Sequence, residues 1–317
     1  MLLTDPPSTQ RTVSFFGGKG GVGKTTLAAS YALLLAGRGH RTLVVSTDPA
    51  HSLGDVLAVP LGDEPAELSG GLWACEIDGE SVARRRVEQV SREAQEAVPR
   101  EVLPAVEQHL QRAAASPGTV ESALVDRLTD LLDEVPARWD RIVVDSAPTG
   151  HMLRLLSLPT LLTPWIEGLV RQREQVRGTE RMLSGLLGRA DTGQDPLLQR
   201  LHGRRSRLER TRRRLLDESA VHLVLVPERL PLAETERAAQ ALADGGLTLG
   251  SVAVNRVAPS DATGLLADRA RREAEVRATI RQRFGDHGVV EVPLLRGELT
   301  ARSELAEVAE HLASAGW

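Results

Sequence analysis

The sequence is poor in cysteine, lysine and aromatic residues, and these scarcities exclude several classes of protein. Cys75 is the only cysteine among 317 residues, so no intrachain disulfide can form and a reducing cytoplasm is the expected location. One cysteine also excludes an iron–sulfur protein that supplies two cluster ligands per subunit. No apolar run approaches the roughly 18 residues that span a bilayer, and residues 1–11 lack the apolar region of a secretory signal. We therefore expect a cytoplasmic protein that associates with membranes at most transiently.

The overall composition is that of a globular protein. Hydrophobic residues make up 41% of the chain and charged residues 26%, and the length is sufficient for a full α/β domain with a sizeable insertion. The formal net charge of −4 gives no general affinity for polyanions. We expect no specific nucleic-acid partner.

Lys19 and Lys24 are the only lysines, and they lie in one glycine-rich stretch, whereas every other residue counted as Lys or Arg is arginine. The compact ammonium group of lysine suits a phosphate cradle, and the planar guanidinium group of arginine is not equivalent to it. Residues 18–25 match G-x-x-x-x-G-K-[ST], the P-loop. An apolar run, residues 13–16, precedes the pattern, and residues 26–35 have helical character. This is the strand–loop–helix context that the motif requires.

The P-loop predicts a binding site for ATP and Mg²⁺. Glycines let successive backbone N–H groups converge on phosphate oxygens, and the N-terminus of the following helix adds partial positive charge. Lys24 is expected to reach the β- and γ-phosphates, and the Thr25 hydroxyl group to bind Mg²⁺. A guanine reader of the Asn-Lys-x-Asp type is excluded, because no further lysine exists. The predicted nucleotide-binding residues are Gly18, Lys19, Gly20, Gly21, Val22, Gly23, Lys24, Thr25 and Thr26.

Short β-branched apolar runs predict the strands of the core. Such runs are typical of strands that are buried on both faces, so we predict an α/β fold with a doubly wound, mostly parallel sheet and helices on both sides. The expected strands are residues 13–16, 42–47, 72–77, 142–145, 221–226, 251–255 and 289–292.

Two long segments, residues 81–134 and 148–219, show helical periodicity and no strand signal. Each lies between successive predicted strands of the nucleotide-binding core. We predict that they pack together as a helical subdomain inserted into a single P-loop domain that covers residues 1–317.

Acidic residues follow two of the predicted strands. Asp48 and Asp55 lie in residues 47–55, and Asp145 begins residues 145–151. In open α/β sheets ligands bind outside the carboxyl ends of the strands, so both loops should face the P-loop. Carboxylates placed there can hold Mg²⁺, directly or through water, or orient an attacking water. An isolated Asp at a strand end is often a helix N-cap, but two such loops beside a P-loop favour the catalytic interpretation.

Together these three motifs resemble the ArsA/Get3 family of ATPases. Residues 18–25 are similar to the deviant Walker A motif, in which Lys19 is an additional signature lysine, and residues 48–55 and 145–151 resemble switch I and switch II of this family. The signature lysine is shared with partition and cell-division ATPases. The second and third motifs select the ArsA/Get3 family.

The resemblance implies roles for the residues of the three motifs. Lys19 would cross a dimer interface and stabilise charge at the nucleotide of the other subunit, as an arginine finger does in trans. Thr25 and Asp145 would hold Mg²⁺, Asp48 would support that metal shell, and Asp55 would position the hydrolytic water. The implied catalytic residues are Asp55, Lys19 and Lys24, and the implied contacts with the adenine base are Asn255, Pro293 and Leu294.

The family resemblance also implies an ATP-driven dimer that captures or targets hydrophobic segments of membrane proteins. Arsenite-binding members use cysteines and eukaryotic targeting members use a Cys-x-x-Cys zinc clasp, and Cys75 alone supplies neither. The alternative is a soluble motor or regulatory subunit of a membrane transport system of the arsenical or anion pump type. The partner would be an identical subunit or a related P-loop ATPase.

An apolar stripe in the second helical segment is a candidate groove for a hydrophobic client. An apolar stripe on a helix is commonly its core face, and methionine, which promiscuous grooves favour, occurs only three times. Groove and core both stay open as interpretations. The stripe consists of Leu158, Leu161, Leu162, Trp165, Ile166, Leu169, Met182, Leu183, Leu186 and Leu187.

Residues 171–214 hold thirteen arginines against five acids. Such a segment suits an acidic partner, lipid headgroups or nucleic acid. The absence of aromatic residues for base stacking favours a solvated helical face instead.

Overall fold

The computed structural model describes residues 11–50, 52–97, 117–186, 195–295 and 302–317. The seven predicted strands are all present, with ends within two residues of the expected ones, and one further strand, β3, joins them. The strands are β1 (Val13–Gly18), β2 (Thr42–Ser46), β3 (Ala66–Ser69), β4 (Leu72–Glu76), β5 (Arg141–Asp145), β6 (Ser219–Leu225), β7 (Leu249–Val257) and β8 (Val289–Pro293).

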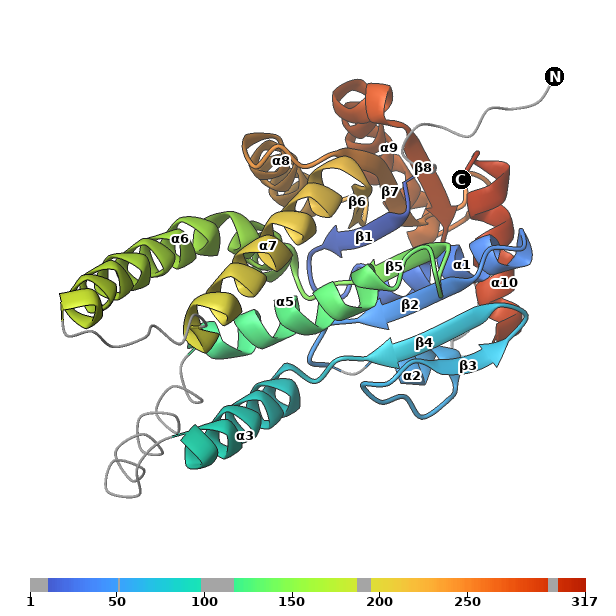
Figure 1. The fold of residues 1–317 in the computed structure, drawn as a ribbon. Coiled ribbons are helices and arrows are strands. Elements are labelled where there is room, and N and C mark those ends of the chain that lie inside the picture. Colours follow the sequence, from blue (N-terminus) through green and yellow to red (C-terminus); the bar gives the residue numbers. More distant parts are fainter. Residues whose placement is uncertain (1–10, 51, 98–116, 187–194, 296–301) are drawn as a thin grey trace.

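The strands form one eight-stranded sheet in the order β3-β4-β2-β5-β1-β6-β7-β8 (Figure 1). All neighbours are parallel except β3 and β4, which pair antiparallel. The predicted doubly wound α/β class is therefore confirmed. The register places Phe16 of β1 and Ser46 of β2 level with Asp145 of β5. The carboxyl ends of these three strands consequently meet at one point.

The sequence pattern did not predict β3. Its four residues, AELS, contain no apolar run, and none of them is buried. They become a strand by pairing with the neighbouring β4, an interaction at the sheet edge that local sequence does not encode.

Helices cover both faces of the sheet because successive side chains of each strand point to opposite sides. Phe16 and Val44 face α1 (Lys24–Gly37) and α10 (Arg302–Ser314). Phe15 and Val45 face the other side of the sheet, where several further helices pack. These are α5 (Pro117–Asp133), α6 (Thr149–Leu186), α7 (Pro196–Asp217), α8 (Arg229–Asp244) and α9 (Leu265–Phe284).

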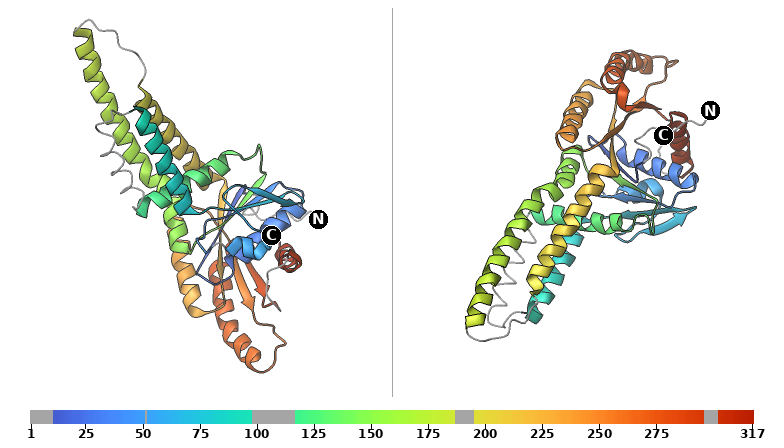
Figure 2. Two further views of the ribbon diagram at one scale, coloured as in Figure 1. Left: turned by 90° about the horizontal axis from the view of Figure 1, so that it is seen from below. Right: turned by 45° about the horizontal axis from the view of Figure 1, so that its top comes forward.

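Among the described residues, the two long segments predicted to be helical contain four helices. They are α3 (Gly79–Ala97), α5, α6 and α7, with α3 against α5 and α6 against both α5 and α7. Figure 2 shows α6 and α7 running side by side away from one end of the sheet. Segment 148–219 ends one residue too late, because Ser219 is the first residue of β6. The helical subdomain itself stays a prediction.

Part of the apolar stripe is core. Ile166 is 1% exposed and packs with Val170 of α6 and Leu208 of α7, so the client-groove interpretation is wrong for this residue. Leu161 on the same helix is 64% exposed. The side chains of Trp165, Met182, Leu183 and Leu186, together with Leu187, lie outside the described residues.

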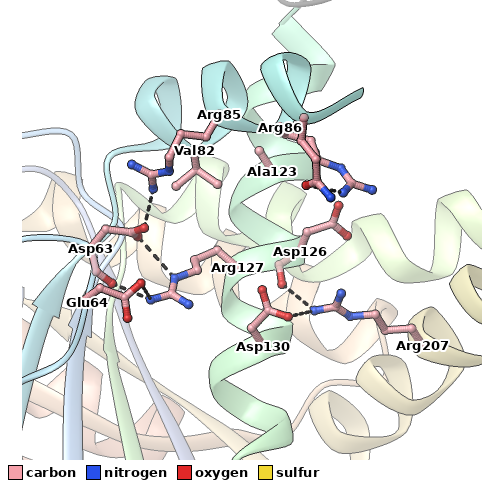
Figure 3. Close-up of a pocket in the computed structure, with 11 residues that line it drawn as sticks. Asp63, Glu64, Val82, Arg85, Arg86, Ala123, Asp126, Arg127, Asp130 and Arg207 are labelled. Atoms are coloured by element: carbon pink, nitrogen blue, oxygen red, sulfur yellow. Dashed lines mark hydrogen bonds and ion pairs between the residues drawn. The ribbon is translucent and has the colours of Figure 1, made fainter. Parts of the chain in front are cut away.

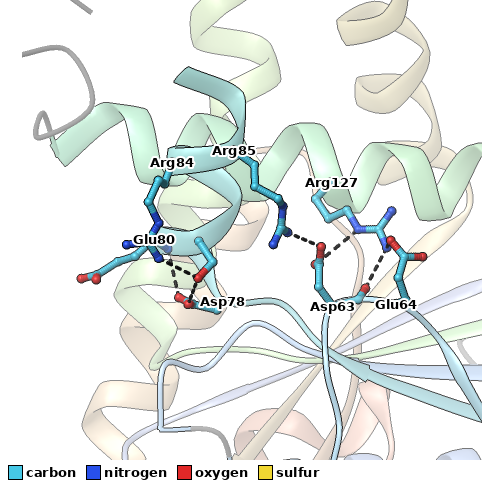
Figure 4. Close-up of polar contacts among 8 residues, drawn as sticks. Asp63, Glu64, Asp78, Glu80, Arg84, Arg85 and Arg127 are labelled. Carbon is cyan, nitrogen blue, oxygen red and sulfur yellow. Dashed lines mark hydrogen bonds and ion pairs between the residues drawn. The ribbon is translucent and has the colours of Figure 1, made fainter. Parts of the chain in front are cut away.

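Ion pairs connect the loop before β3 to α3 and α5. We call this cluster of Asp63, Glu64, Arg85 and Arg127 the Asp63 brace. Asp63 of this loop accepts hydrogen bonds from Arg85 of α3 and Arg127 of α5, and Arg127 also pairs with Glu64 at 3.1 Å (Figure 4). Because the side chains of Arg127 and Asp63 are only 16% and 21% exposed, the bond between these two is screened less by solvent than an ordinary surface pair.

A second set of ion pairs joins α5 to α7. Arg207 of α7 pairs with Asp130 and donates a hydrogen bond to the backbone carbonyl oxygen of Asp126 (Figure 3). These residues and the Asp63 brace line a cavity of about 300 Å³. Its acids and arginines largely compensate one another, so the cavity braces the helices and does not present a charged ligand site.

In the described part of the chain, no helix is both long and apolar enough to cross a membrane.

Candidate functional site

The P-loop connects the end of β1 to the start of α1. Lys24 is the first residue of α1 and only 5% exposed. Its ammonium group donates a hydrogen bond to the backbone carbonyl oxygen of Lys19 at 3.4 Å. The charge is therefore held inside the curve of the loop, next to the N-terminal end of α1, where both favour an anion.

Two glycines of this loop are required by close packing. A Cβ atom at Gly18 would lie 2.3 Å from the carbonyl oxygen of Val224, and one at Gly23 would lie 2.3 Å from the side-chain nitrogen of Asn255. Gly23 also has a φ of 94°, in the left-handed region. Asn255 in turn donates a hydrogen bond to the carbonyl oxygen of Val22 at 2.8 Å. Asn255 of β7 thus supports the P-loop directly.

The Asp145 carboxyl group lies where β1, β2 and β5 end. It is fully buried, and its Oδ2 accepts a hydrogen bond from the Ser46 hydroxyl group at 3.0 Å. The same hydroxyl oxygen accepts a hydrogen bond from the backbone N–H of Asp48 at 3.2 Å. Ser46 therefore links the two acidic loops. The other oxygen, Oδ1, is buried without a hydrogen-bond partner in the structure.

Burial raises the pKa of Asp145 to about 6. The nearby hydroxyl groups of Thr25 and Ser46 and the positive charge of Lys24 oppose this rise, and the Asp48 carboxylate adds to it. Asp145, Lys24, Thr25 and Asp48 thus lie close enough to affect one another electrostatically.

These residues fit a hard divalent cation. Mg²⁺ prefers hydroxyl, carboxylate and water oxygens, and it commonly binds through one or two carboxylates plus phosphate. The free Oδ1 of Asp145 and the Thr25 hydroxyl group are such ligands, and the Ser52 hydroxyl group lies 3.1 Å from that of Thr25. Thr25 and Asp145 would hold Mg²⁺, with Asp48 nearby, and the ion would neutralise charge on the bound phosphates.

Asp55 is exposed in the first turn of the short helix α2 (Ser52–Leu57). The preceding residue, Gly54, donates its backbone N–H to Glu76 Oε1 at 2.9 Å, and Glu76 is only 8% exposed. A Cβ atom at Gly54 would lie 2.9 Å from the carbonyl oxygen of Val59. Glu76, at the end of β4, therefore fixes the position of α2 and with it the backbone of Asp55.

Lys19 points away from the phosphate cradle. Its ammonium group pairs with Glu234 of α8 at 3.7 Å, and the two side chains are 42% and 36% exposed. Exposed pairs of this kind contribute roughly 0–1 kcal/mol. Lys19 can therefore leave Glu234 at little cost.

The residues predicted to contact the adenine base, Asn255, Pro293 and Leu294, lie near the ends of β7 and β8. Pro293 is the last residue of β8, and the backbone N–H of Leu294 donates to the carbonyl oxygen of Val257 at 2.9 Å. Together with Asn255, they occupy the carboxyl ends of β7 and β8. Contact of these residues with adenine, and the catalytic roles of Asp55 and Lys19, stay predictions.

Sequence reasoning missed three residues that contact the site: Ser46 and Glu76, which hold its loops, and Glu234, which pairs weakly with Lys19. Ser46 and Glu76 are the last residues of β2 and β4, so the strand-end rule that selected Asp145 was a usable signal for both. Glu234 lies in the middle of a surface helix. Nothing in its local pattern indicated the contact with Lys19.

Comparisons with known proteins agree with this geometry. A family model described as Anion-transporting ATPase matches residues 11–314. The chain is 32% identical over 302 residues to the putative arsenical pump-driving ATPase 2 of Aquifex aeolicus, an alignment that covers 95% of this chain and 98% of that protein. It is 31% identical over 294 residues to the ATPase GET3A of Arabidopsis thaliana, covering 90% and 79% of the two chains.

A third relative is longer than this chain. Identity to the ATPase ARSA1 of Chlamydomonas reinhardtii is 32% over 275 residues, which covers 78% of this chain and 35% of that protein. The chain therefore spans about a third of the length of that relative.

We predict that Asp145→Asn stabilises the metal-free protein at neutral pH. The pKa of Asp145, about 6 in the folded state, lies above the ordinary value of 3.8. The carboxyl group ionises near pH 3.8 in the unfolded chain but only near pH 6 in the folded protein. The free energy of unfolding therefore falls as the pH rises between these values, and the loss is constant at higher pH. Removing the charge should raise the free energy of unfolding by about 3 kcal/mol at pH 7, measured by urea denaturation without Mg²⁺.

Two further measurements complete this test. The advantage of the variant should shrink as the pH falls from 6 toward 4, because the wild-type carboxyl group is then protonated in the folded state and only partly ionised in the unfolded chain. Mg²⁺ with ATP should stabilise the wild type more than the variant, because the variant lacks a carboxylate ligand. A variant that is less stable than the wild type at pH 7 would contradict the assignment of a costly buried charge.

Proposed function

The chain belongs to the ArsA family of anion-transporting ATPases and is itself an ATPase, and from this premise we propose that it uses Mg²⁺ and works as a dimer that closes on ATP. The observation that carries the proposal is the buried Asp145 carboxyl group, with one oxygen free, beside Lys24 and Thr25. A buried acid next to a phosphate-binding lysine is suited to hold a metal ion against the β- and γ-phosphates.

In this proposal Asp55 positions the water that attacks the γ-phosphate. Its exposed carboxylate stands in the first turn of α2, and Glu76 holds the backbone of that turn through Gly54. Phosphoryl transfer depends mainly on positioning and charge stabilisation, so a water-orienting carboxylate has a large effect on turnover.

We expect Asp55→Asn to bind ATP with near-normal affinity and to lose at least about a hundredfold in kcat, an effect similar to the loss of a charge-organising donor elsewhere. Turnover would be followed by phosphate release and binding by titration with a fluorescent ATP analogue. Asp133→Asn, which changes an exposed acid in the last turn of α5, is the matched control and should retain wild-type kcat. Wild-type turnover in Asp55→Asn would show that another group orients the water.

The proposed dimer depends on Lys19. A lysine this early in the loop is not needed for phosphate binding in cis, because Lys24 already occupies the inner curve. Its weak pairing with Glu234 leaves it free to reach the nucleotide of a second subunit and stabilise transition-state charge there. The second subunit would be an identical chain or a related P-loop ATPase.

A light-scattering experiment tests this role. With a non-hydrolysable ATP analogue, the wild type should shift from monomer to dimer, and Lys19→Ala should remain monomeric and lose most of its ATPase activity. Glu234→Gln removes the cis ion pair while leaving Lys19 in place, so this variant should dimerise at least as well as the wild type. Full activity of a strictly monomeric wild type with ATP would rule out the trans role.

We further propose that the helices carry a hydrophobic client, such as a segment of a membrane protein. The relative from Arabidopsis is named as an ATPase of the GET3 type. Among the described side chains of α6, Leu161 is 64% exposed and Val176 is 43% exposed. Each would gain on burial, at roughly 25 cal/mol per Å² of apolar surface. The client would be captured in the cytoplasm and released near a membrane after hydrolysis.

The second candidate is a motor or regulatory subunit of a membrane transport system, and the name of the Aquifex relative favours it. Stimulation by arsenite is disfavoured in either case. Cys75 is buried in β4, and burial raises the pKa of its thiol to about 12. A metalloid needs thiolate ligands, and this thiol is neither accessible nor ionised at neutral pH.

Capture of a synthetic transmembrane peptide separates these two functions. Leu161→Asp should reduce crosslinking of the peptide in the ATP state by several-fold while leaving basal ATPase activity unchanged, because this side chain is exposed. Ile166→Asp is the contrasting variant and should unfold the α6–α7 pair, since it buries a charge in the core. No peptide capture by the wild type, with ATPase activity intact, would favour the transport subunit.

A further inference from the structure

A second cavity, of about 590 Å³, lies between the sheet and the helices below the two acidic loops. Its walls are mainly apolar and come from elements far apart in the sequence: Phe15 of β1, Val144 of β5, Leu124 of α5 and Met152 of α6. It lies on the sheet face opposite α1, because Phe15 and Phe16 point to opposite sides. We call it the helix–sheet cavity.

Three of the polar residues around the helix–sheet cavity already have partners. Ser146 donates its hydroxyl hydrogen to the carbonyl oxygen of Phe16 at 2.6 Å, and Thr47 donates to that of Asp145 at 3.5 Å. Asp78 accepts hydrogen bonds from the N-terminal turn of α3, including the backbone N–H of Glu80 at 3.1 Å (Figure 4). These groups therefore contribute little to the recognition of a ligand.

Glu121 of α5 is different. Its Oε2 is buried and has no hydrogen-bond partner in the structure. Its Oε1 lies 3.4 Å from Arg154, whose side chain is 60% exposed, so that pair is weak. A buried carboxylate oxygen without a donor costs free energy. Glu121 is a lining residue of the cavity, so a small rotation of its side chain would present this oxygen to a donor that enters the cavity, and the hydrogen bond would recover that cost.

We propose that the helix–sheet cavity binds a small amphipathic cation, with an apolar body against Phe15, Leu124 and Met152 and an ammonium or similar N–H donor on Glu121. The volume lies within the range of roughly 300–1,000 Å³ typical of small-molecule sites. Apolar walls with one convergent charged acceptor are the arrangement that fixes both affinity and orientation in such sites.

Occupancy of this cavity would affect the nucleotide site. Thr47 and Pro49 from the first acidic loop and Ser146 and Ala147 from the second line the same cavity. These residues flank Asp48 and Asp145, so a bound cation would favour one arrangement of both loops. This regulatory consequence rests on the proposed ATPase mechanism, whereas binding itself does not.

Binding is tested with tryptamine and with tryptophol, which has the same indole body and a neutral hydroxyl group in place of the amine. Titration by calorimetry should show the wild type binding tryptamine at least tenfold more tightly than tryptophol, as expected for a charge-assisted hydrogen bond. Glu121→Gln should remove this preference and leave tryptophol affinity unchanged. Leu124→Trp should abolish binding of both compounds by filling the cavity.

The variants are first checked for native circular dichroism, and Val120→Phe, which changes another lining residue, replaces Leu124→Trp if that variant does not fold. Absence of tryptamine binding to the wild type at millimolar concentration would overturn the proposal. So would equal tryptamine affinity in Glu121→Gln, or binding that survives the filled cavity. If tryptamine binds as expected but its affinity is the same with and without an ATP analogue, the regulatory link fails and the site stands.

Discussion

Asp145 is a buried carboxyl group at the point where three parallel strands end, and the surrounding structure compensates for that burial. The Ser46 hydroxyl group satisfies one oxygen, and Lys24 supplies positive charge from the start of α1. These contacts only partly offset desolvation, which is why the pKa is raised to about 6. A bound divalent cation would supply the missing compensation. The P-loop and both acidic loops therefore depend on the same carboxyl group.

The loops around this group are held from two directions. Glu76 fixes the turn before Asp55, and Ser46 connects the backbone of Asp48 to Asp145. Farther along the chain, the Asp63 brace ties the loop before β3 to α3 and α5 (Figure 4). A movement at the first acidic loop would thus reach the helices through a short series of hydrogen bonds and ion pairs.

An aromatic cluster packs on one face of the sheet, and the helix–sheet cavity lies on the other. On the α1 face, Phe16, Tyr31, His222 and Trp317 stack closely, with ring centroids 4.6 to 5.9 Å apart. Burial lowers the pKa of His222 to about 3, so it is neutral and serves as core. On the opposite face, the helix–sheet cavity lies directly below the acidic loops. The aromatic cluster packs against the strand that leads into the P-loop, and the cavity adjoins both acidic loops.

The P-loop, the parallel core and the acids at the strand ends could all be predicted from local sequence. Glycine spacing predicts the P-loop, β-branched runs predict the buried strands, and ligand binding at the carboxyl ends of strands selects the acids. Local sequence did not determine β3, which exists only through its pairing with β4. It left the apolar stripe ambiguous, and only the packing of α6 on α7 assigned Ile166 to the core and Leu161 to the surface. The Lys19–Glu234 pair and the partnerless Oε2 of Glu121 likewise arise between elements that are distant in the chain. Such contacts are set by tertiary packing, for which a local pattern of residues carries no signal.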